Sequence, residues 1–257
     1  RRYKQDGLGF YFSPRLVEWL GPKREGDAID DPYVDYAASL QALLESVTLE
    51  LIETYLADVL SHTGRLCFAG GVALNVKLNQ QIMARSDVNE LFVQPAASDA
   101  GTALGAASYV AQALGDTIQP LADVYLGPAF STDACRRACE THPARPTYKT
   151  VADAPVEAAR LLAAGHPVAW FQGRMEFGPR ALGGRSIIGD ARSPKMQSVM
   201  NLKIKYRESF RPFAPAVLRE DVDEYFEMRP GEDSPYMLLV APVRDQKRCA
   251  LNGEMDG

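Results

Sequence analysis

The chain has 257 residues, of which 46% are hydrophobic and 24% are charged, and its formal net charge is −5 at pH 7. A chain of this length can build two domains, each with its own hydrophobic core. It contains no run of about 18 apolar residues and no apolar N-terminal stretch with a small-residue cleavage site, so we expect neither a transmembrane helix nor a signal peptide.

The cysteines favour free thiols. Cys67, Cys135, Cys139 and Cys249 form no CxxC pair. Cys135 and Cys139 are four positions apart and would share one face of a helix, a spacing that suits neither a disulfide nor a zinc knuckle. The three histidines are scattered along the chain and are interpreted as surface or loop residues. This pattern is typical of reduced thiols in a cytoplasmic protein.

In chain order, the first half alternates helices with short strands. Residues 31–60 predict one long amphipathic helix, because apolar residues recur every three or four positions after the start signal Asp31. Residues 65–75 predict a buried strand that ends in a glycine turn, and residues 75–85 predict a helix behind it. The stretch 91–93 begins the same order again, with a turn and an Ala-rich helix. Strand–turn–helix units in series favour an α/β architecture.

The second half is predicted to be a separate domain of the α/β or α+β type. Residues 115–127 contain proline and glycine and predict a linker in front of it. The predicted helices of this half cover residues 131–142 and 155–165, and the predicted strands cover residues 166–173, 210–218 and 234–243.

Two turns behind the first two strands are candidate ligand sites. Gly70 and Gly71 stand between a strand and a helix, where glycine lets the backbone approach a ligand and a helix N-terminus offers N–H groups to an anion. Asp99 lies in the turn behind the second strand, where a carboxylate suits a metal or phosphate-proximal role. The alternatives are a tight turn without a ligand and helix capping by Ser98 or Asp99. Ligands in open α/β sheets gather at strand C-terminal ends, which favours one shared cleft.

The strongest signal is a basic stretch. Residues 170–212 hold nine Lys or Arg against three Asp or Glu, in a chain with a negative net charge. Arg174, Arg180 and Arg185 are punctuated by Gly-Pro and Gly-Gly pairs and mixed with apolar residues. That composition is typical of a half-buried pocket in which Arg side chains grip phosphate oxygens. Further positive charge comes from Lys203, Lys205, Arg207 and Arg211.

The alternatives for this stretch are a solvated basic face and a nucleic-acid patch. RNA binding favours exposed aromatic residues interleaved with cations, whereas Phe177, Phe210 and Phe213 lie near Gly or Pro and are interpreted as packing residues. A small phosphorylated ligand is therefore the favoured hypothesis. No GxSxG, HExxH or P-loop motif occurs. We predict polyphosphate and adenylate chemistry that works by positioning and charge neutralisation.

Five motifs in this order, AASLQALLE, FAGGVALN, QPAASDAGTALGAA, FGPRALGGRSII and FRPFAPAVL, closely resemble those of the O-carbamoyltransferases of the nodulation and cephamycin/tobramycin carbamoyltransferase family. The similarity runs nearly end to end. It implies an α/β fold in two parts. Residues 1–118 resemble the second lobe of an actin/sugar-kinase-like ATPase fold, and residues 119–257 resemble a YrdC-like α/β domain with a twisted sheet.

The resemblance also implies an activity. The YrdC-like domain uses ATP and carbamoyl phosphate to form carbamoyl adenylate. The kinase-like domain then transfers the carbamoyl group to a hydroxyl of a small-molecule acceptor, such as a natural product or a glycan. Mg²⁺ is expected with the ATP, and iron is the divalent metal expected beside the carbamoyl group.

Three groups of residues match the family motifs. The basic side chains expected to bind carbamoyl phosphate and the ATP phosphates are Arg174, Arg180, Arg185, Lys205, Arg207 and Arg211, together with Ser186. The adenosine of the adenylate is assigned to Gly70, Gly71 and Asn75. Asp99 matches a carboxylate that helps to hold the metal.

The sequence departs from the family in one respect, because members carry an HxxH-type pair of metal-ligand histidines and this chain has none. One carboxylate cannot make an iron site unaided. We therefore expect a piece of a longer protein, without the first lobe and with a shortened end. Its expected partners are a complementing lobe or a second copy, and neither nucleic acid nor a membrane.

Two alternatives remain open. One is a truncated nucleotide-binding module without catalysis. The other is a related enzyme that transfers carbamoyl or threonylcarbamoyl groups to protein or tRNA, which the lack of CxxC and the negative net charge disfavour.

Overall fold

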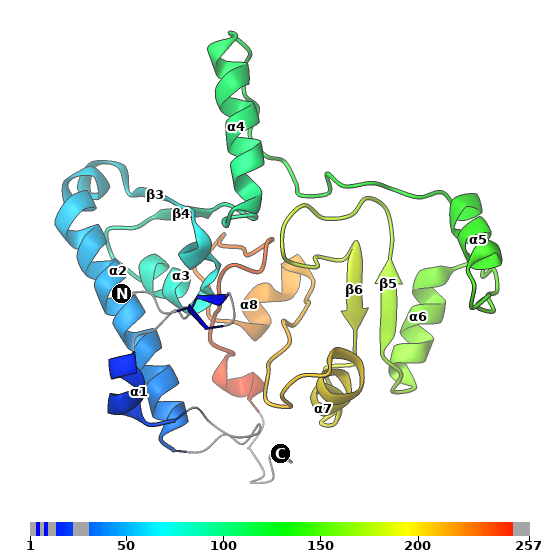
Figure 1. Cartoon of the computed structure of the whole chain (residues 1–257). Coiled ribbons are helices and arrows are strands. Elements are labelled where there is room, and N and C mark those ends of the chain that lie inside the picture. The colour runs from blue at the N-terminus through cyan, green and yellow to red at the C-terminus, as the bar shows by residue number, and fades with distance from the viewer. Residues whose placement is uncertain (1–3, 6–7, 10–13, 23–30, 249–257) are drawn as a thin grey trace. The chain divides into compact units, whose positions relative to one another are not determined.

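The computed structural model describes residues 4–5, 8–9, 14–22 and 31–248, and the chain divides into two compact units, residues 1–48 and 49–257 (Figure 1). Cys249 and the C-terminal residues behind it, which suggested a shortened end, lie outside the described residues. None of the helices in the described ranges combines the length and the hydropathy that a bilayer crossing requires.

The first unit contributes a short strand pair and the start of a long helix. β1 (Lys4–Gln5) pairs antiparallel with β2 (Leu8–Gly9), and α1 (Pro14–Leu20) follows. α2 (Tyr33–Thr63) begins in this unit and ends in the second. It confirms the helix predicted for residues 31–60, although Ile52 and Leu60 are its only described buried residues.

The second unit begins with a parallel strand pair. β3 (Arg65–Phe68) lies beside β4 (Glu90–Val93), with Phe68 opposite Val93. The 3-10 helix η1 (Gly71–Leu74) and α3 (Val76–Met83) connect the two strands, and α4 (Ala100–Ala113) follows the second. The predicted strand–turn–helix order is thus confirmed twice. Because the strands are parallel, the turns behind them lie at the same edge of the pair.

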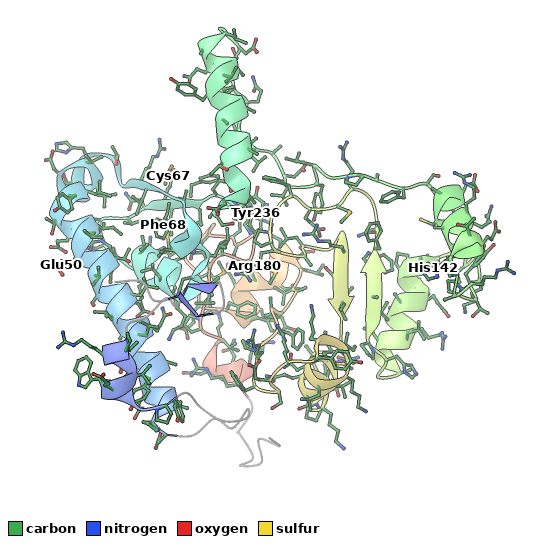
Figure 2. All side chains as sticks on the ribbon, viewed as in Figure 1. Glu50, Cys67, Phe68, His142, Arg180 and Tyr236 are labelled. Atoms are coloured by element: carbon green, nitrogen blue, oxygen red, sulfur yellow. The ribbon has the colours of Figure 1, made fainter. Side chains whose placement is uncertain are left out.

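A small hydrophobic core joins these turns to the C-terminal part of the chain. Ala73, Val93, Ala97 and Leu238 are all 6% exposed or less, and Phe68 and Tyr236, both labelled in Figure 2, pack against them. The buried amide of Asn79 completes the junction, since its Nδ2 donates to the carbonyl oxygens of Ala73 and Leu238 at 2.8 Å each.

An antiparallel pair carries the arginine motif. β5 (Val168–Phe171) pairs with β6 (Arg185–Ile188), which confirms the strand predicted over residues 166–173. Residues 172–184 connect the two strands and are called the arginine loop below.

The segment 124–128 runs beside the arginine loop. The N–H of Gly127 donates to the carbonyl oxygen of Met175 at 2.9 Å, and the N–H of Phe177 donates to that of Val124 at 2.6 Å. The region predicted as a linker therefore ends in contact with the motif that it precedes.

The two helices predicted in the second half are confirmed, each with a side-chain cap. α5 (Thr132–Thr141) begins behind Ser131, whose Oγ accepts the N–H of Ala134 at 3.2 Å. α6 (Ala154–Ala163) begins behind Asp153, whose carboxylate caps it in the same way at 3.0 Å. Cys135 and Cys139 of α5 and Cys67 of β3 are free, as predicted.

Two predicted strands are wrong. Residues 210–218 and 234–243 form no strand, and of them only Val243 makes an isolated bridge, to Phe226. Each segment contains two prolines, which have no N–H to donate to a strand ladder. Their apolar side chains pack as irregular chain instead, as Leu238 does in the core.

The remaining elements behind β6 are short. They are α7 (Met196–Ser198), the π-helix η2 (Val199–Lys205), the 3-10 helix η3 (Arg219–Asp221), α8 (Val222–Tyr225) and the 3-10 helix η4 (Asp245–Lys247).

Candidate functional site

Three motifs that are far apart in the sequence meet in the second unit. The N–H of Gly70 donates to the carbonyl oxygen of Ala97 at 2.7 Å, which joins the turns behind β3 and β4. From the arginine loop, Nη2 of Arg180 donates to the carbonyl oxygen of Leu74 at 3.3 Å (Arg180 is labelled in Figure 2). The two turns therefore lie in contact, as the predicted shared cleft requires, and the arginine loop joins them.

Glycine and serine shape the arginine loop where it meets its surroundings. Gly178 has a φ of +115°, and a Cβ at this position would lie 3.2 Å from the carbonyl oxygen of Pro95. The loop can therefore approach the turn behind β4 this closely only without a side chain at residue 178. Ser186 lies just behind the loop, and its Oγ accepts the N–H of Gly183 at 3.0 Å.

The glycine turn offers open backbone. Gly70 has a φ of +95°, in the left-handed region, and both Gly70 and Gly71 are exposed. A Cβ built on either one would meet no atom within 4 Å. A ligand therefore has room to approach this backbone, as the prediction for the two glycines requires. Asn75, predicted beside them, caps α3, since its Oδ1 accepts the N–H of Leu78 at 3.0 Å.

Asp99 has neither a capping hydrogen bond nor a metal cluster in the structure. Its exposed side chain makes no cap hydrogen bond to α4, so the capping interpretation is wrong for this residue. Within the described ranges, no three His, Cys, Asp or Glu side chains are grouped so that they could hold a metal ion.

The arginine loop is organised around Glu176, which the sequence analysis did not select. This residue is 3% exposed, and its Oε1 accepts the N–H groups of Leu182 and Gly184 at 2.7 Å each and that of Arg185 at 3.3 Å. Burial raises the pKa of Glu176, but the backbone N–H donors together lower it by more than burial raises it. Its pKa therefore lies below the usual value. The carboxylate is therefore charged at neutral pH.

The three predicted arginines of this region differ in their contacts. Arg174 is exposed, and its Nε donates to a backbone carbonyl oxygen at 2.9 Å. Arg185 donates to the carbonyl oxygens of Glu176 and Gly178 at 2.8 Å each. Arg180 is half-buried, and its Nε is buried without a hydrogen-bond partner in the described structure. Arg180 thus reaches the glycine turn while its Nε–H group has no acceptor in the described structure.

The second basic segment, residues 203–211, folds around a buried amide. Asn201 is 0% exposed, and its Nδ2 donates to the carbonyl oxygens of Ser209 and Arg211 at 2.8 Å each. Its Oδ1 accepts from Nε of Arg207 at 2.6 Å. One side chain therefore holds the backbone that carries two of the predicted basic residues.

The basic side chains of this segment lie in different surroundings. The guanidinium of Arg207 is 4.8 Å from the ring centre of Phe213, a cation–π contact. Arg211 forms an ion pair with Glu208 at 2.7 Å. Lys205 is exposed at the C-terminal end of η2.

Replacing Asn201 by alanine is expected to lower the free energy of unfolding by about 2 kcal/mol, because the three hydrogen bonds of this buried amide are lost, including the shorter of the two that each backbone carbonyl group accepts. Urea denaturation would measure the loss. Gln197→Ala is the matched control, since the exposed Nε2 of Gln197 donates to the same two carbonyl oxygens at 3.4 and 3.2 Å. Its expected cost is about 0.5 kcal/mol or less, and equal losses in both variants would contradict this assignment.

Sequence reasoning missed the buried polar residues that hold these motifs in place. Asn79, Glu176 and Asn201 are the buried polar residues of the described chain. Each binds the backbone of a different motif. The available signal was local, because Glu176 and Asn201 stand between two apolar residues, and Asn79 follows Leu78. A polar residue in that position suggests burial, but its partners cannot be read from the sequence.

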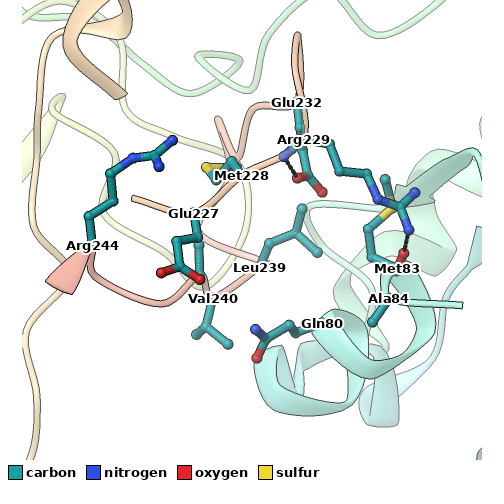
Figure 3. A pocket seen from close by; sticks show the side chains of 11 residues that line it. Gln80, Met83, Ala84, Glu227, Met228, Arg229, Glu232, Leu239, Val240 and Arg244 are labelled. Carbon is teal, nitrogen blue, oxygen red and sulfur yellow. Dashed lines mark hydrogen bonds between the residues drawn. The ribbon is translucent and has the colours of Figure 1, made fainter. Parts of the chain in front are cut away.

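A pocket of about 390 Å³ lies in another part of the second unit (Figure 3). Its walls come from the end of α3 and from residues 227–244, and none of the predicted site residues lines it. Arg229 on its wall is committed to the fold, since its Nη1 donates to the carbonyl oxygen of Val88 at 2.8 Å. The predicted site is therefore separate from this pocket.

Comparison with known proteins agrees with the motifs. The family model described as carbamoyltransferase N-terminus matches residues 10–108, and the one described as carbamoyltransferase C-terminus matches residues 159–255. The first range includes the glycine turn, and the second includes the arginine loop.

Curated relatives show the same similarity. An uncharacterized protein of Synechocystis sp. is 46% identical over 87% of this chain and 37% of its own length. The nodulation protein NolNO of Sinorhizobium fredii is 38% identical over 93% of this chain and 35% of its own length. The nodulation protein NolO of Bradyrhizobium diazoefficiens is 39% identical, with shares of 93% and 44%. The chain thus spans less than half the length of each of these three relatives. Because both family models match it and the nodulation proteins are similar over most of its length, the chain belongs to the carbamoyltransferase family.

Proposed function

We propose that the chain is part of an ATP-dependent O-carbamoyltransferase. It would form carbamoyl adenylate from carbamoyl phosphate and ATP, and the carbamoyl group would pass to a hydroxyl of a small-molecule acceptor, a natural product or a glycan. Family membership supports carbamoyl transfer. The adenylate mechanism is supported by one observation, the 3.3 Å hydrogen bond from Arg180 to Leu74 that brings the arginine loop to the glycine turn.

Adenylate formation needs dense positive charge. Carbamoyl phosphate would first lose its phosphate to water and give carbamate. A carbamate oxygen would then attack the α-phosphorus of ATP and displace pyrophosphate, with Mg²⁺ bound to the ATP. Cationic side chains stabilise such steps by positioning the phosphates and neutralising their charge. The proposed phosphate ligands are Arg174, Arg180, Arg185, Lys205, Arg207 and Arg211, with Ser186, and the proposed adenosine ligands are Gly70, Gly71 and Asn75.

Iron beside Asp99 belongs to the proposal through the family pattern alone. The described residues form no group of three or more metal-ligating side chains around it, and one carboxylate does not hold iron unaided. The remaining ligands would come from outside the described residues, and no step is assigned to the metal.

We also propose a division of the chain into two domains. Residues 1–118 would belong to the kinase-like lobe for carbamoyl transfer, and residues 119–257 to the YrdC-like domain for adenylate formation. The protein would be cytoplasmic, and a complementing lobe or a second copy would complete the transfer site.

Release of pyrophosphate from ATP by the 257-residue chain tests the proposal. The expected result is release that requires carbamoyl phosphate. Asp99→Ala is expected to retain that release, because Asp99 is assigned to the transfer site. Absence of release from wild-type protein that circular dichroism shows to be folded would contradict adenylate formation by this chain. It would favour a nucleotide-binding module without catalysis.

A further inference from the structure

The arginine loop is arranged around an anion that the protein itself supplies. The N–H groups of Leu182, Gly184 and Arg185 converge on Oε1 of Glu176 at 2.7, 2.7 and 3.3 Å. Successive backbone N–H groups that point to one spot usually form a nest for a bound anion. Here the buried carboxylate of Glu176 fills that nest, so the conformation of the loop depends on this side chain.

Arg185 completes the internal arrangement. Its Nη1 and Nη2 donate to the carbonyl oxygens of Glu176 and Gly178 at 2.8 Å each, and its Nε lies 3.8 Å from Oε2 of Glu176. The guanidinium therefore ties the middle of the loop to the first residue of β6. Oε2 of Glu176 is buried without a hydrogen bond in the described structure, so Arg185 is its nearby counter-charge.

Gly184 shows how closely the loop encloses the carboxylate. A Cβ at this position would lie 3.1 Å from Cδ of Glu176 and 2.9 Å from the carbonyl oxygen of Arg174. Both contacts are shorter than ordinary van der Waals contacts, so a side chain at residue 184 would displace the carboxylate or the backbone.

Arg180 lies within the segment that these contacts hold at both ends. It reaches Leu74 in the glycine turn with Nη2, while its buried Nε has no acceptor in the described structure. A buried N–H without a partner costs free energy. The one hydrogen bond of the guanidinium, to Leu74, is therefore offset by this cost, and the fixed loop around Arg180 contributes to its position.

We propose that Glu176 is a positioning residue: its buried carboxylate, with Arg185 as internal counter-charge, holds the arginine loop so that Arg180 is presented to a phosphorylated ligand at the glycine turn. The ligand rests on the proposed function. The positioning of Arg180 by Glu176 rests on the loop alone. Arg185 then acts on its own loop, which removes it from the phosphate ligands proposed above, and Arg180 acts on the ligand.

Glu176→Gln is the primary variant, because it keeps the size of the side chain and removes its charge. Isothermal titration of the 257-residue chain with carbamoyl phosphate is expected to show a Kd raised about tenfold, as for the loss of one charge-assisted hydrogen bond. Glu157→Gln is the matched control, since the carboxylate of Glu157 pairs with Arg160 and Lys149 away from the loop. It is expected to leave the Kd unchanged.

Two further variants separate positioning from stability. Ala158→Gly in α6 lowers stability without touching the loop, and it should leave the Kd unchanged. The single variant Arg185→Gln is compared with Glu176→Gln and with the double variant that carries both changes. The double variant should have a Kd no higher than that of the weaker-binding single variant, because both changes remove the same internal contact. A Kd that rises in Ala158→Gly as much as in Glu176→Gln would overturn the positioning role. So would a double variant whose rise in Kd equals the product of the rises in the two single variants.

A direct readout needs no activity. The Nε–H resonance of Arg180 is expected to be visible in the wild-type chain, because that nitrogen is buried, and to be lost in Glu176→Gln. A retained resonance would overturn the inference. Wild-type protein that fails to bind carbamoyl phosphate would instead contradict the proposed function, and the resonance would still decide the role of Glu176.

Discussion

Replacing Arg180 by alanine is expected to lower carbamoyl-phosphate-dependent pyrophosphate release by at least ~100-fold, in the range seen when one charge-stabilising donor is removed from an active site. Arg180 is the side chain that joins the arginine loop to the glycine turn, through its hydrogen bond to Leu74. Loss of that one hydrogen bond costs only about 1 kcal/mol of stability. The variant should therefore remain folded while adenylate formation disappears.

Arg192→Ala is the control for this experiment. Arg192 lies behind the same loop, but its side chain is 81% exposed and pairs with Asp190 at 2.7 Å. Its removal takes away one positive charge without touching the glycine turn, and release is expected to stay within about twofold of wild type. Unchanged release in Arg180→Ala would remove Arg180 from the site, and equal losses in both variants would indicate a general effect of surface charge.

Gly101→Ala is expected to lower the free energy of unfolding by about 3 kcal/mol, the upper part of the range for overpacked sites. A Cβ at residue 101 would lie 2.4 Å from the carbonyl oxygen of Ala96, which is backbone and cannot rotate away. The turn behind β4 would have to shift, and with it Ala97, the acceptor for Gly70. Urea denaturation measures the stability, and pyrophosphate release measures the effect on the site.

Gly105→Ala in the same helix provides the opposite result. A Cβ at residue 105 meets no atom within 4 Å, and alanine favours a helix over glycine by about 0.5–1 kcal/mol. This variant is therefore expected to be more stable than wild type. Two Gly→Ala changes in α4 with opposite signs would show that the turn behind β4 is tightly packed. Equal effects of the two changes would contradict that packing.

The sequence predicted the elements whose signals are local. β3 and β4 were recognisable as short apolar runs followed by turns, and α5 and α6 from their caps and periodicity. The strands predicted at residues 210–218 and 234–243 were wrong because the same local signal is ambiguous. A short apolar run fits a strand or a packed irregular segment equally well. Leu238 shows the second outcome, since it completes a core whose other members lie far away in the sequence.

The candidate site was predictable in residue type and only partly in arrangement. The glycine turn and the arginine motif were each visible in the sequence, and the rule that ligands in open α/β sheets gather at strand C-terminal ends predicted one cleft at the two turns. The contact of Arg180 with Leu74 was not predictable, because the two residues are 106 positions apart. Glu176 was not predictable either, because a glutamate near arginines suggests an exposed ion pair until its burial is known.

By itself, the sequence determined the helices and short strands with strong periodicity or caps, the two turns, the excess of positive charge, and the motifs that indicate the carbamoyltransferase family. These features depend on neighbouring residues or on ordered motifs. Only the tertiary structure decided which arginine reaches the glycine turn and which one binds the carbonyl oxygens of its own loop. That difference depends on burial and on hydrogen bonds such as the one from Arg180 to Leu74, which lies far away in the sequence. The Glu176 carboxylate contributes by accepting the backbone N–H groups of Leu182, Gly184 and Arg185.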